Sequence, residues 1–482
     1  MKILKDIIYG VDLDSIRGDT GVMIKSIEFD SRKVVEGSLF VAIKGLNSDG
    51  HKFIDKAIKN GASAVIYNDY FLKEEKVTFI KTTNTRKSLA IVASNFYDNP
   101  SKKIKLIGIT GTNGKTTVAT TLFNLFNKAG LKSGLISTIN IQYAGVEIKN
   151  HHTTPDPKRI NEILNKMSQK DIEFCFMEVS SHGIDQDRIN GLKFYCGVFT
   201  NITRDHLDYH KSFASYRDIK KRFFDNLESD SYAIINSDDK NSKFMVQNCS
   251  SKVKTFGIKN IADNMAKVLE IDFSGMLLKI NDKEFWTPLI GKFNASNILA
   301  VFSVACLAGI KSIEILRILS QTKVINGRFE IYKTPNNAFV IIDYAHTPNS
   351  LENVIDTISQ IRTKNELFTT IIGCGGNRDV GKRSKMGEIV LNGCDRVIFT
   401  SDNPRYEKPE KIINDMLLDV DPNNMKKISK IINRREAIES GCSKLNSGDI
   451  LLVVGKGHET YQEIKGEKIP FSDIKVVKES FS

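Results

Sequence analysis

A chain of 482 residues is too long to fold around one hydrophobic core, and its length predicts about three domains. With 41% hydrophobic and 26% charged residues, the composition is typical of a soluble globular protein, and no apolar stretch reaches the roughly 18 residues of a membrane span. The formal net charge of +12 is spread along the chain without a basic block or an aromatic-interleaved basic motif. We therefore expect a lysine-rich surface, with no nucleic-acid partner and no membrane insertion.

The first residues and the cysteines indicate the compartment. Asp6 interrupts the start of the chain before an apolar segment of signal-peptide length can form. Seven scattered cysteines, an odd number without a C-x-x-C pair, predict reduced thiols rather than disulfides or a metal site. We expect a cytoplasmic protein and a monomer.

Two breaks in the sequence pattern predict the domain boundaries. Pro100 and a basic cluster interrupt residues 95–105, and Gly327 and Pro335 interrupt residues 326–339. The expected domains are 1–98, 99–330 and 331–482.

From about residue 100 onward, short apolar segments alternate with helical patterns, which predicts parallel sheets with crossover helices. We expect an α/β protein with a central, mostly parallel P-loop-type sheet, a Rossmann-like C-terminal domain and a smaller α/β N-terminal domain. Chemistry is expected at the carboxyl ends of the strands. The expected strands are 105–110, 174–179, 196–202, 232–236, 339–344, 368–374, 396–402 and 450–455.

The segment GITGTNGKTT, residues 108–117, lies between an expected strand and an expected helix, as a phosphate-binding loop does. The general pattern G-x-x-x-x-G-K-[ST] fails by one residue, because Ile109 stands where its first glycine belongs. The loop still has two small residues, Gly111 and Gly114, a cation in Lys115 for the outer phosphates and a hydroxyl in Thr116 for Mg²⁺. A glycine-rich turn with a purely structural role is the alternative.

The same segment resembles the nucleotide loop of the Mur ligases, the ATP-dependent enzymes that add amino acids during peptidoglycan synthesis. Further motifs resemble those of the tripeptide-forming, MurE-type members, and the resemblance covers nearly the whole chain. It implies the ATP-dependent addition of a diamino acid to UDP-N-acetylmuramoyl-L-alanyl-D-glutamate through an acyl phosphate. These motifs are residues 29–54, 152–156, 177–188, 200–210, 327–330, 343–348, 373–383, 402–405 and 455–459.

The resemblance implies two cofactors, ATP and Mg²⁺. Lys115, Glu178, His206 and Lys220 would be catalytic, and the metal ligands would be Thr116, Glu178, His206 and a carbamate on Lys220. Lys221 is the alternative carrier of that carbamate; only one of two adjacent helical residues can face the site, and we expect the other to point to solvent. Because Mg²⁺ prefers oxygen ligands, a hydrogen-bonded histidine without metal is the alternative for His206. The implied ATP-binding residues are Gly111, Thr112, Asn113, Gly114, Lys115, Thr116, Thr117, Asn297 and Arg328.

The resemblance also implies residues for the two small-molecule substrates. The UDP-dipeptide would be bound at its peptide end by Thr153, Thr154, Ser180, Gln186 and Arg188, and at its uridine end by Phe29, Ser31, Leu46, Asn47 and Ser48. The DSR stretch beginning at Asp30 is equally well interpreted as a turn. The diamino acid would be bound by Arg383, Asp402, Asn403, Pro404, Arg405, Gly455 and Glu459.

Arg405 bears on which diamino acid is added. In the family an arginine at this place accompanies meso-diaminopimelate, which has one carboxylate more than lysine, and a guanidinium binds such a group bidentately. Glu459 is expected to meet an ammonium group. A structural salt bridge is the alternative for Arg405.

Three other functions stay open. A lysine-adding relative would usually carry another residue at position 405. A ligase like folylpolyglutamate synthetase would lack the DNPR motif and the uridine domain. A binding protein switched by a nucleotide would have no use for a diamino-acid pocket.

Overall fold

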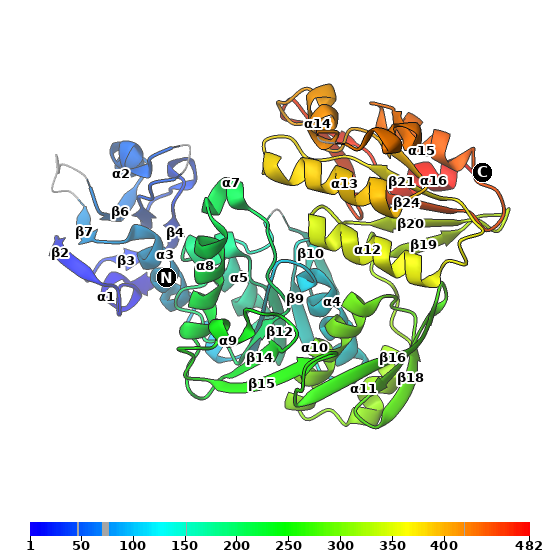
Figure 1. Ribbon diagram of the computed structural model, residues 1–482. Coiled ribbons are helices and arrows are strands. Elements are labelled where there is room, and N and C mark those ends of the chain that lie inside the picture. The colour runs from blue at the N-terminus through cyan, green and yellow to red at the C-terminus, as the bar shows by residue number, and fades with distance from the viewer. Residues whose placement is uncertain (46–47, 70–76, 151, 419) are drawn as a thin grey trace.

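The computed structural model describes residues 1–482 except 46–47, 70–76, 151 and 419, and in this part of the chain three large sheets follow one another. The central sheet lies between the N-terminal part, blue in Figure 1, and the C-terminal part, yellow to red. The α/β class and the three-part architecture expected from the sequence are confirmed. The division at residues 98 and 330 stays a prediction.

The N-terminal sheet is five-stranded, with the order β2-β7-β6-β5-β4 and one antiparallel edge between β2 and β7. A short pair of strands, β1 and β3, lies beside it. The elements are β1 (Lys2–Ile3), α1 (Leu4–Ile7), β2 (Leu13–Arg17), β3 (Met23–Ile24), β4 (Ser26–Glu28), β5 (Ser38–Val41), α2 (Ile54–Lys59), β6 (Ala62–Tyr67), β7 (Thr78–Thr82) and α3 (Thr85–Phe96).

The central sheet has eleven strands in the order β11-β10-β9-β12-β8-β13-β14-β15-β16-β17-β18. Its middle is parallel, and antiparallel strands extend both edges. Its strands are β8 (Lys105–Thr110), β9 (Ser133–Ile136), β10 (Asn140–Tyr143), β11 (Val146–Lys149), β12 (Phe174–Glu178), β13 (Cys196–Phe199), β14 (Tyr232–Asn236), β15 (Lys252–Gly257), β16 (Asn264–Asp272), β17 (Gly275–Ile280) and β18 (Lys283–Thr287).

Helices cover both faces of this sheet. Val118 and Leu122 of α4 and about half of α10 are buried in one apolar core with β8 and β12. Apolar residues of α5 and α8 are buried in a second core against the other face of the same strands. The helices are α4 (Lys115–Lys128), α5 (Pro157–Ser168), α6 (Ser181–Asp185), α7 (Leu207–His210), α8 (Phe213–Asp225), α9 (Ser242–Met245), α10 (Lys292–Leu307) and α11 (Ser312–Leu319).

The C-terminal sheet has six strands in the order β19-β20-β24-β21-β22-β23, of which only β19 is antiparallel to its neighbour. A two-stranded hairpin, β25 with β26, follows it. The elements are β19 (Glu330–Lys333), β20 (Phe339–Asp343), α12 (Pro348–Ile361), β21 (Phe368–Ile372), α13 (Arg383–Gly393), β22 (Arg396–Phe399), α14 (Pro409–Met416), β23 (Ile428–Lys430), α15 (Arg434–Cys442), β24 (Ile450–Val454), β25 (Tyr461–Ile464), β26 (Glu467–Pro470) and α16 (Asp473–Glu479).

All eight strands expected from the sequence are present, as β8, β12, β13, β14, β20, β21, β22 and β24, and several end one to three residues early. All seven cysteines are free, as expected. In the described part of the chain, no helix has both the length and the apolarity needed to cross a membrane. Because β8, β12, β13 and β14 are parallel, the loops that follow them gather at one edge of the central sheet.

Candidate active site

The loop between β8 and α4 has the geometry of a phosphate-binding loop. Gly111 (φ 152°) and Gly114 (φ 89°) adopt positive φ values. A Cβ atom on Gly111 would lie 1.9 Å from Thr200 Oγ1, and one on Gly114 would lie 2.4 Å from Asn297 Oδ1, so both positions require glycine. The Lys115 ammonium donates to the carbonyl oxygens of Gly111 (3.0 Å) and Thr112 (2.8 Å), which holds its side chain across the loop.

Lys220 on α8 reaches the same loop. Its Nζ lies 3.0 Å from Gly111 O and 3.4 Å from Thr110 Oγ1, and the residue is 1% exposed. Burial lowers the pKa of Lys220 well below its ordinary value, and the nearby charge of Lys115 lowers it further. The pKa of Lys115 is also lowered, mainly by burial. Two amines with lowered pKa values therefore meet at the phosphate loop.

Lys221 is directed elsewhere. Its Nζ lies 2.5 Å from Asp225 Oδ1, one helical turn further along α8, and 5.7 Å from the centre of the Phe244 ring. The expectation that the second lysine points to solvent is wrong, because Lys221 is only 6% exposed. The ion pair with Asp225 explains how this cation is buried away from the loop.

Glu178 lies at the carboxyl end of β12 and is fully buried. Thr138 donates to both of its carboxylate oxygens, from the backbone N–H to Oε1 (2.7 Å) and from the hydroxyl to Oε2 (3.1 Å). A carboxylate can accept further hydrogen bonds or a metal ion at the same oxygens. Within the described residues, no three His, Cys, Asp or Glu side chains are grouped as they would be around a metal ion.

His206 is the N-cap residue of α7, with a left-handed backbone (φ 53°), and its Nε2 lies 3.4 Å from Asp205 Oδ2. Burial lowers the pKa of His206 to about 3, against the opposing effect of Asp205, so the ring is neutral at neutral pH. Asp205 also faces two residues of the C-terminal region, His346 Nε2 at 3.7 Å and Lys382 Nζ at 4.0 Å. Burial opposes ionisation of Asp205, but these neighbours hold its pKa well below the ordinary range.

A cavity of about 320 Å³ opens between the phosphate loop and the C-terminal region. Five of the expected ATP-binding residues line it, namely Asn113, Gly114, Thr117, Asn297 and Arg328. The other four expected residues, Gly111 and Thr112 of the loop and Lys115 and Thr116 at the start of α4, do not line the cavity. The Arg328 guanidinium lies 4.5 Å from the centre of the Tyr344 ring, and its Nη2 lies 3.4 Å from Thr116 Oγ1.

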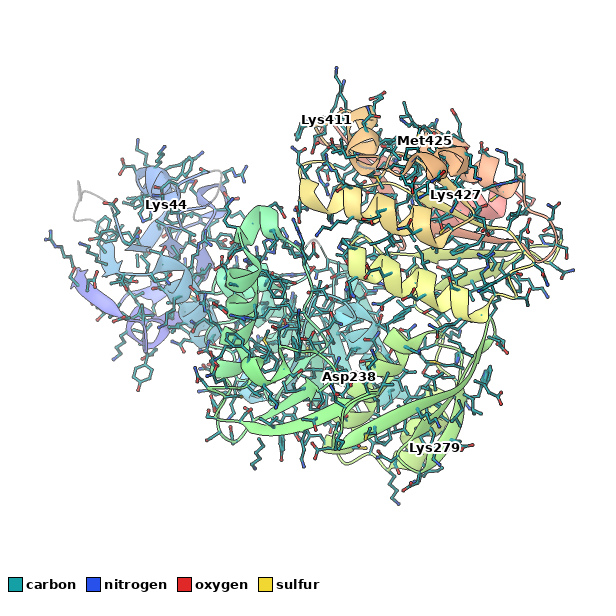
Figure 2. All side chains as sticks on the ribbon, viewed as in Figure 1. Lys44, Asp238, Lys279, Lys411, Met425 and Lys427 are labelled. Atoms are coloured by element: carbon teal, nitrogen blue, oxygen red, sulfur yellow. The ribbon has the colours of Figure 1, made fainter. Side chains whose placement is uncertain are left out.

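Sequence reasoning missed Asp238, another wall residue of this cavity, labelled in Figure 2. Its carboxylate accepts hydrogen bonds from the backbone N–H groups of Ile258 (2.6 Å), Lys259 (3.0 Å) and Asn260 (2.8 Å). Asp238 therefore fixes the loop after β15, which also lines the cavity. The signal for this residue in the sequence was the run of polar residues 237–240 that follows strand 232–236.

A larger cavity, about 860 Å³, lies between the N-terminal and central regions. Of the expected UDP-dipeptide residues, Phe29, Ser31, Ser48, Gln186 and Arg188 line it. Leu46 and Asn47 lie outside the described residues. Arg86 and Lys56 also line this cavity and were not expected from the sequence.

Thr153, Thr154 and Ser180 do not line this cavity but connect it to Glu178. Thr154 Oγ1 donates to Glu178 O (2.8 Å) and lies 3.0 Å from Ser180 Oγ. Thr153 Oγ1 lies 3.0 Å from Thr138 Oγ1, the same hydroxyl that donates to the Glu178 carboxylate.

A third, small cavity of about 150 Å³ lies where the central and C-terminal regions meet. Its walls include five of the residues expected to bind the diamino acid, namely Asp402, Asn403, Arg405, Gly455 and Glu459, together with Asp205 and His206 of the central region. Pro404 does not line it. Glu459 Oε2 accepts from Lys456 Nζ and from Asn403 Nδ2, both at 2.8 Å.

Arg383 does not line this cavity, so its expected contact with the diamino acid is not supported. It is fully buried, and its guanidinium donates to Glu407 (2.9 Å) and Asp415 (2.7 Å). This bonding lowers the pKa of Glu407 to about 2. Arg378, five residues earlier in the same motif, does line the cavity and is half exposed. The motif contains two arginines, and the one predicted to bind the diamino acid, Arg383, has a structural role instead.

Comparison with known proteins assigns the family. Three family models match successive segments of the chain: Mur ligase family, catalytic domain (23–97), Mur ligase middle domain (109–305) and Mur ligase, glutamate ligase domain (327–457). The UDP-N-acetylmuramoyl-L-alanyl-D-glutamate–2,6-diaminopimelate ligase of Phocaeicola vulgatus is 46% identical over 482 residues, covering 99% of each chain.

Solved structures agree with this assignment. A UDP-N-acetylmuramoyl-L-alanyl-D-glutamate–2,6-diaminopimelate ligase is 29% identical with a TM-score of 0.70, over 100% of this chain and 99% of that chain. The folylpolyglutamate synthase of Mycobacterium tuberculosis, solved with ADP and AMPPCP, is 17% identical with a TM-score of 0.62, over 77% of this chain and 92% of that one. At this identity the second likeness shows the fold alone. From the family models, the full-length relatives and the shared fold, this chain belongs to the Mur ligase family.

Proposed function

We propose that this ligase joins meso-diaminopimelate to UDP-N-acetylmuramoyl-L-alanyl-D-glutamate with cleavage of ATP to ADP and phosphate, in the cytoplasmic synthesis of peptidoglycan precursors. The names of its full-length relatives support this substrate pair. The observation that carries the proposal is the 150 Å³ cavity, because its walls combine cations, including Arg378 and Arg405, with several carboxylates, including Glu459, as an amino acid with two ammonium and two carboxylate groups requires. That set of charges suits an amino acid with a second carboxylate.

The three cavities fit the three reactants of this reaction. The 860 Å³ cavity would hold the UDP-sugar, and its dipeptide would extend along Thr153, Thr154 and Ser180 toward Glu178. The 320 Å³ cavity would hold the nucleoside of ATP, with its phosphates on the loop at Lys115. The 150 Å³ cavity would hold the incoming diamino acid.

The chain's own residues explain how a carboxylate could be activated. A carboxylate is a poor electrophile, and transfer of the γ-phosphoryl group to it gives an acyl phosphate with ADP as the leaving group. Negative charge then builds up on the transferred group, so the site requires cations and N–H donors rather than a protein nucleophile. Lys115 and the backbone N–H groups of the phosphate loop would meet that charge. The incoming amine would then displace phosphate from the acyl carbon.

The residues expected to bind Mg²⁺ fit that ion in part. Thr116 and Glu178 offer the oxygen atoms that Mg²⁺ prefers. Lys220 fits a carbamate, because only an unprotonated amine combines with CO₂ and burial favours the neutral form of this one. His206, neutral at the same edge of the sheet, would complete the set. When bound, Mg²⁺ would neutralise part of the charge on the phosphate oxygens.

Phosphate release by the purified protein tests the proposal. With the UDP-dipeptide, meso-diaminopimelate and ATP present, release should require all three. Replacement of meso-diaminopimelate by lysine tests the lysine-adding alternative, and replacement of both substrates by a folate and glutamate tests the folylpolyglutamate alternative. A nucleotide-switched binding protein would bind ATP but form no tripeptide in any of these mixtures.

A further inference from the structure

The hairpin β25–β26 forms the outer support of the DNPR loop, residues 402–405. Glu463 N donates to Asn403 Oδ1 (2.9 Å), and Gln462 Nε2 donates to Asp402 O (2.8 Å). Arg405 N donates to Glu463 O (3.0 Å), and Arg405 forms an isolated parallel bridge with Ile464. The backbone of Arg405 is thus fixed by β25, in a left-handed conformation with φ 51°.

The side chain of Arg405 is held by the same strand. Its Nε donates to Glu463 Oε2 (3.1 Å), and its Nη1 donates to Gly376 O (2.7 Å). Among the described residues, Nη2 has no hydrogen-bond acceptor, although a guanidinium carries five N–H donors. The Nη1 and Nη2 edge of Arg405 therefore keeps donors available at a residue that lines the 150 Å³ cavity.

Gly375 provides the room for this arrangement. A Cβ atom there would lie 3.0 Å from Arg405 Nη1, which is tighter than ordinary van der Waals contact. The Glu463 side chain is 25% exposed and that of Arg405 is 19% exposed, so the pair lies at the rim of the cavity rather than in the core. Glu463 is not itself part of the cavity wall.

We propose that Glu463 is a positioning residue and a determinant of amino-acid specificity: it fixes the Arg405 guanidinium so that the Nη1 and Nη2 edge meets the second carboxylate of the incoming diamino acid. This inference rests on the proposed function. Arginine has a flexible side chain, and a fixed guanidinium loses less freedom when it binds a carboxylate. The binding of an amino acid without the second carboxylate does not depend on this edge.

Glu463 could have an opposite effect, because its negative charge also reduces the attraction of Arg405 for a carboxylate. The two effects differ in sign and are separable by substitution. Glu463→Gln removes the charge but leaves a side-chain oxygen that accepts the Nε–H hydrogen bond. Glu463→Ala removes both. Glu467→Ala is a matched control, since Glu467 is an exposed carboxylate on β26 of the same hairpin.

The experiment is steady-state phosphate release by the full-length enzyme and these three variants, with meso-diaminopimelate or lysine as the varied substrate. We expect Glu463→Ala to raise the KM for meso-diaminopimelate about 5- to 20-fold, with kcat and the KM for ATP changed by less than about twofold. The KM of Glu463→Gln for meso-diaminopimelate should stay within about threefold of the wild-type value. The KM of Glu467→Ala should equal the wild-type value. The kcat/KM for lysine should be nearly constant, so that Glu463→Ala narrows the preference for meso-diaminopimelate.

Several results would overturn the inference. An unchanged KM in Glu463→Ala would show that Arg405 is fixed without Glu463. A lower KM in both Glu463 variants would show that the residue only offsets charge. An equal loss of kcat/KM for both amino acids would show a general effect on the loop. If the wild type itself released no phosphate with meso-diaminopimelate, the proposed function would be wrong as well, whereas the first three results leave it intact.

Discussion

Replacement of Arg383 by alanine should destabilise the C-terminal region and leave specificity unchanged. The guanidinium is 1% exposed and donates to Glu407 and Asp415 at 2.7 to 2.9 Å, so its loss leaves two carboxylates without their main partner. Breaking a buried ion pair on one side costs about 3–5 kcal/mol. For a region of about 150 residues this corresponds to a fall of roughly 6–20 °C in its unfolding midpoint.

The pH dependence gives a second measure of the same pair. The pKa of Glu407 in the folded protein is lowered from 4.5 to about 2, chiefly by its hydrogen bonds from Arg383. A lowered folded-state pKa contributes stability above the unfolded value that is lost as the pH falls through the folded value. The difference in the free energy of unfolding between the wild type and Arg383→Ala should therefore be largest above pH 4.5 and decrease as the pH falls toward 2.

Differential scanning calorimetry and steady-state kinetics of Arg383→Ala and Arg378→Ala test this assignment. Arg378→Ala should unfold within about 1 °C of the wild type, because exposed side chains contribute little to stability, and it should raise the KM for meso-diaminopimelate. The reasoning would be refuted if Arg383→Ala kept its unfolding midpoint and lost affinity for meso-diaminopimelate. In that case Arg383 would contact the substrate, as the sequence analysis expected.

Lys115→Ala should lower kcat at least 100-fold with an unchanged unfolding midpoint, because it removes a cation from the phosphate loop; near-normal turnover would contradict that role. Lys220→Ala should be nearly inactive and partly rescued by short carboxylates, whereas Lys221→Ala should keep its kcat and lose stability; rescue of Lys221→Ala instead would move the carbamate by one residue. Arg405→Ala should raise the KM for meso-diaminopimelate about 10- to 150-fold, corresponding to about 1.5–3 kcal/mol, and the kcat/KM for lysine should fall far less; equal losses would contradict a contact with the second carboxylate.

The eight strands predicted from the sequence are buried along nearly their whole length, and such strands appear in the sequence as continuous apolar runs. The segments at 105–110 and 232–236 were predicted to the residue. The sequence analysis did not predict β9, which is parallel to β12, or β15, which is parallel to β14. Strands β16 and β18 were missed as well. They include exposed lysines and glutamates alternating with buried residues, and that alternation gives a weaker signal than a continuous apolar run.

The direction of each side chain, which depends on the folded structure, limited how well the site residues could be predicted from the sequence. The identity of Lys220 as the lysine at the phosphate loop agrees with the structure, because one of two adjacent helical residues had to face the loop. The fate of Lys221 was not predictable, since its partner Asp225 becomes a neighbour only on the formed helix and Phe244 comes from the next one. Arg378 and Arg383 could not be distinguished for a similar reason, because Glu407 and Asp415 lie 24 and 32 residues away in the sequence.

The 320 Å³ and 150 Å³ cavities, proposed here for ATP and the diamino acid, share one loop. Tyr344 and His346 of the segment that follows β20 line both cavities. The same His346 faces Asp205, a residue of the central region next to His206. A ligand that orders this segment in one cavity therefore also shapes the wall of the other. Binding of ATP and binding of the diamino acid should be coupled through these two side chains, because a ligand in either cavity contacts the same segment.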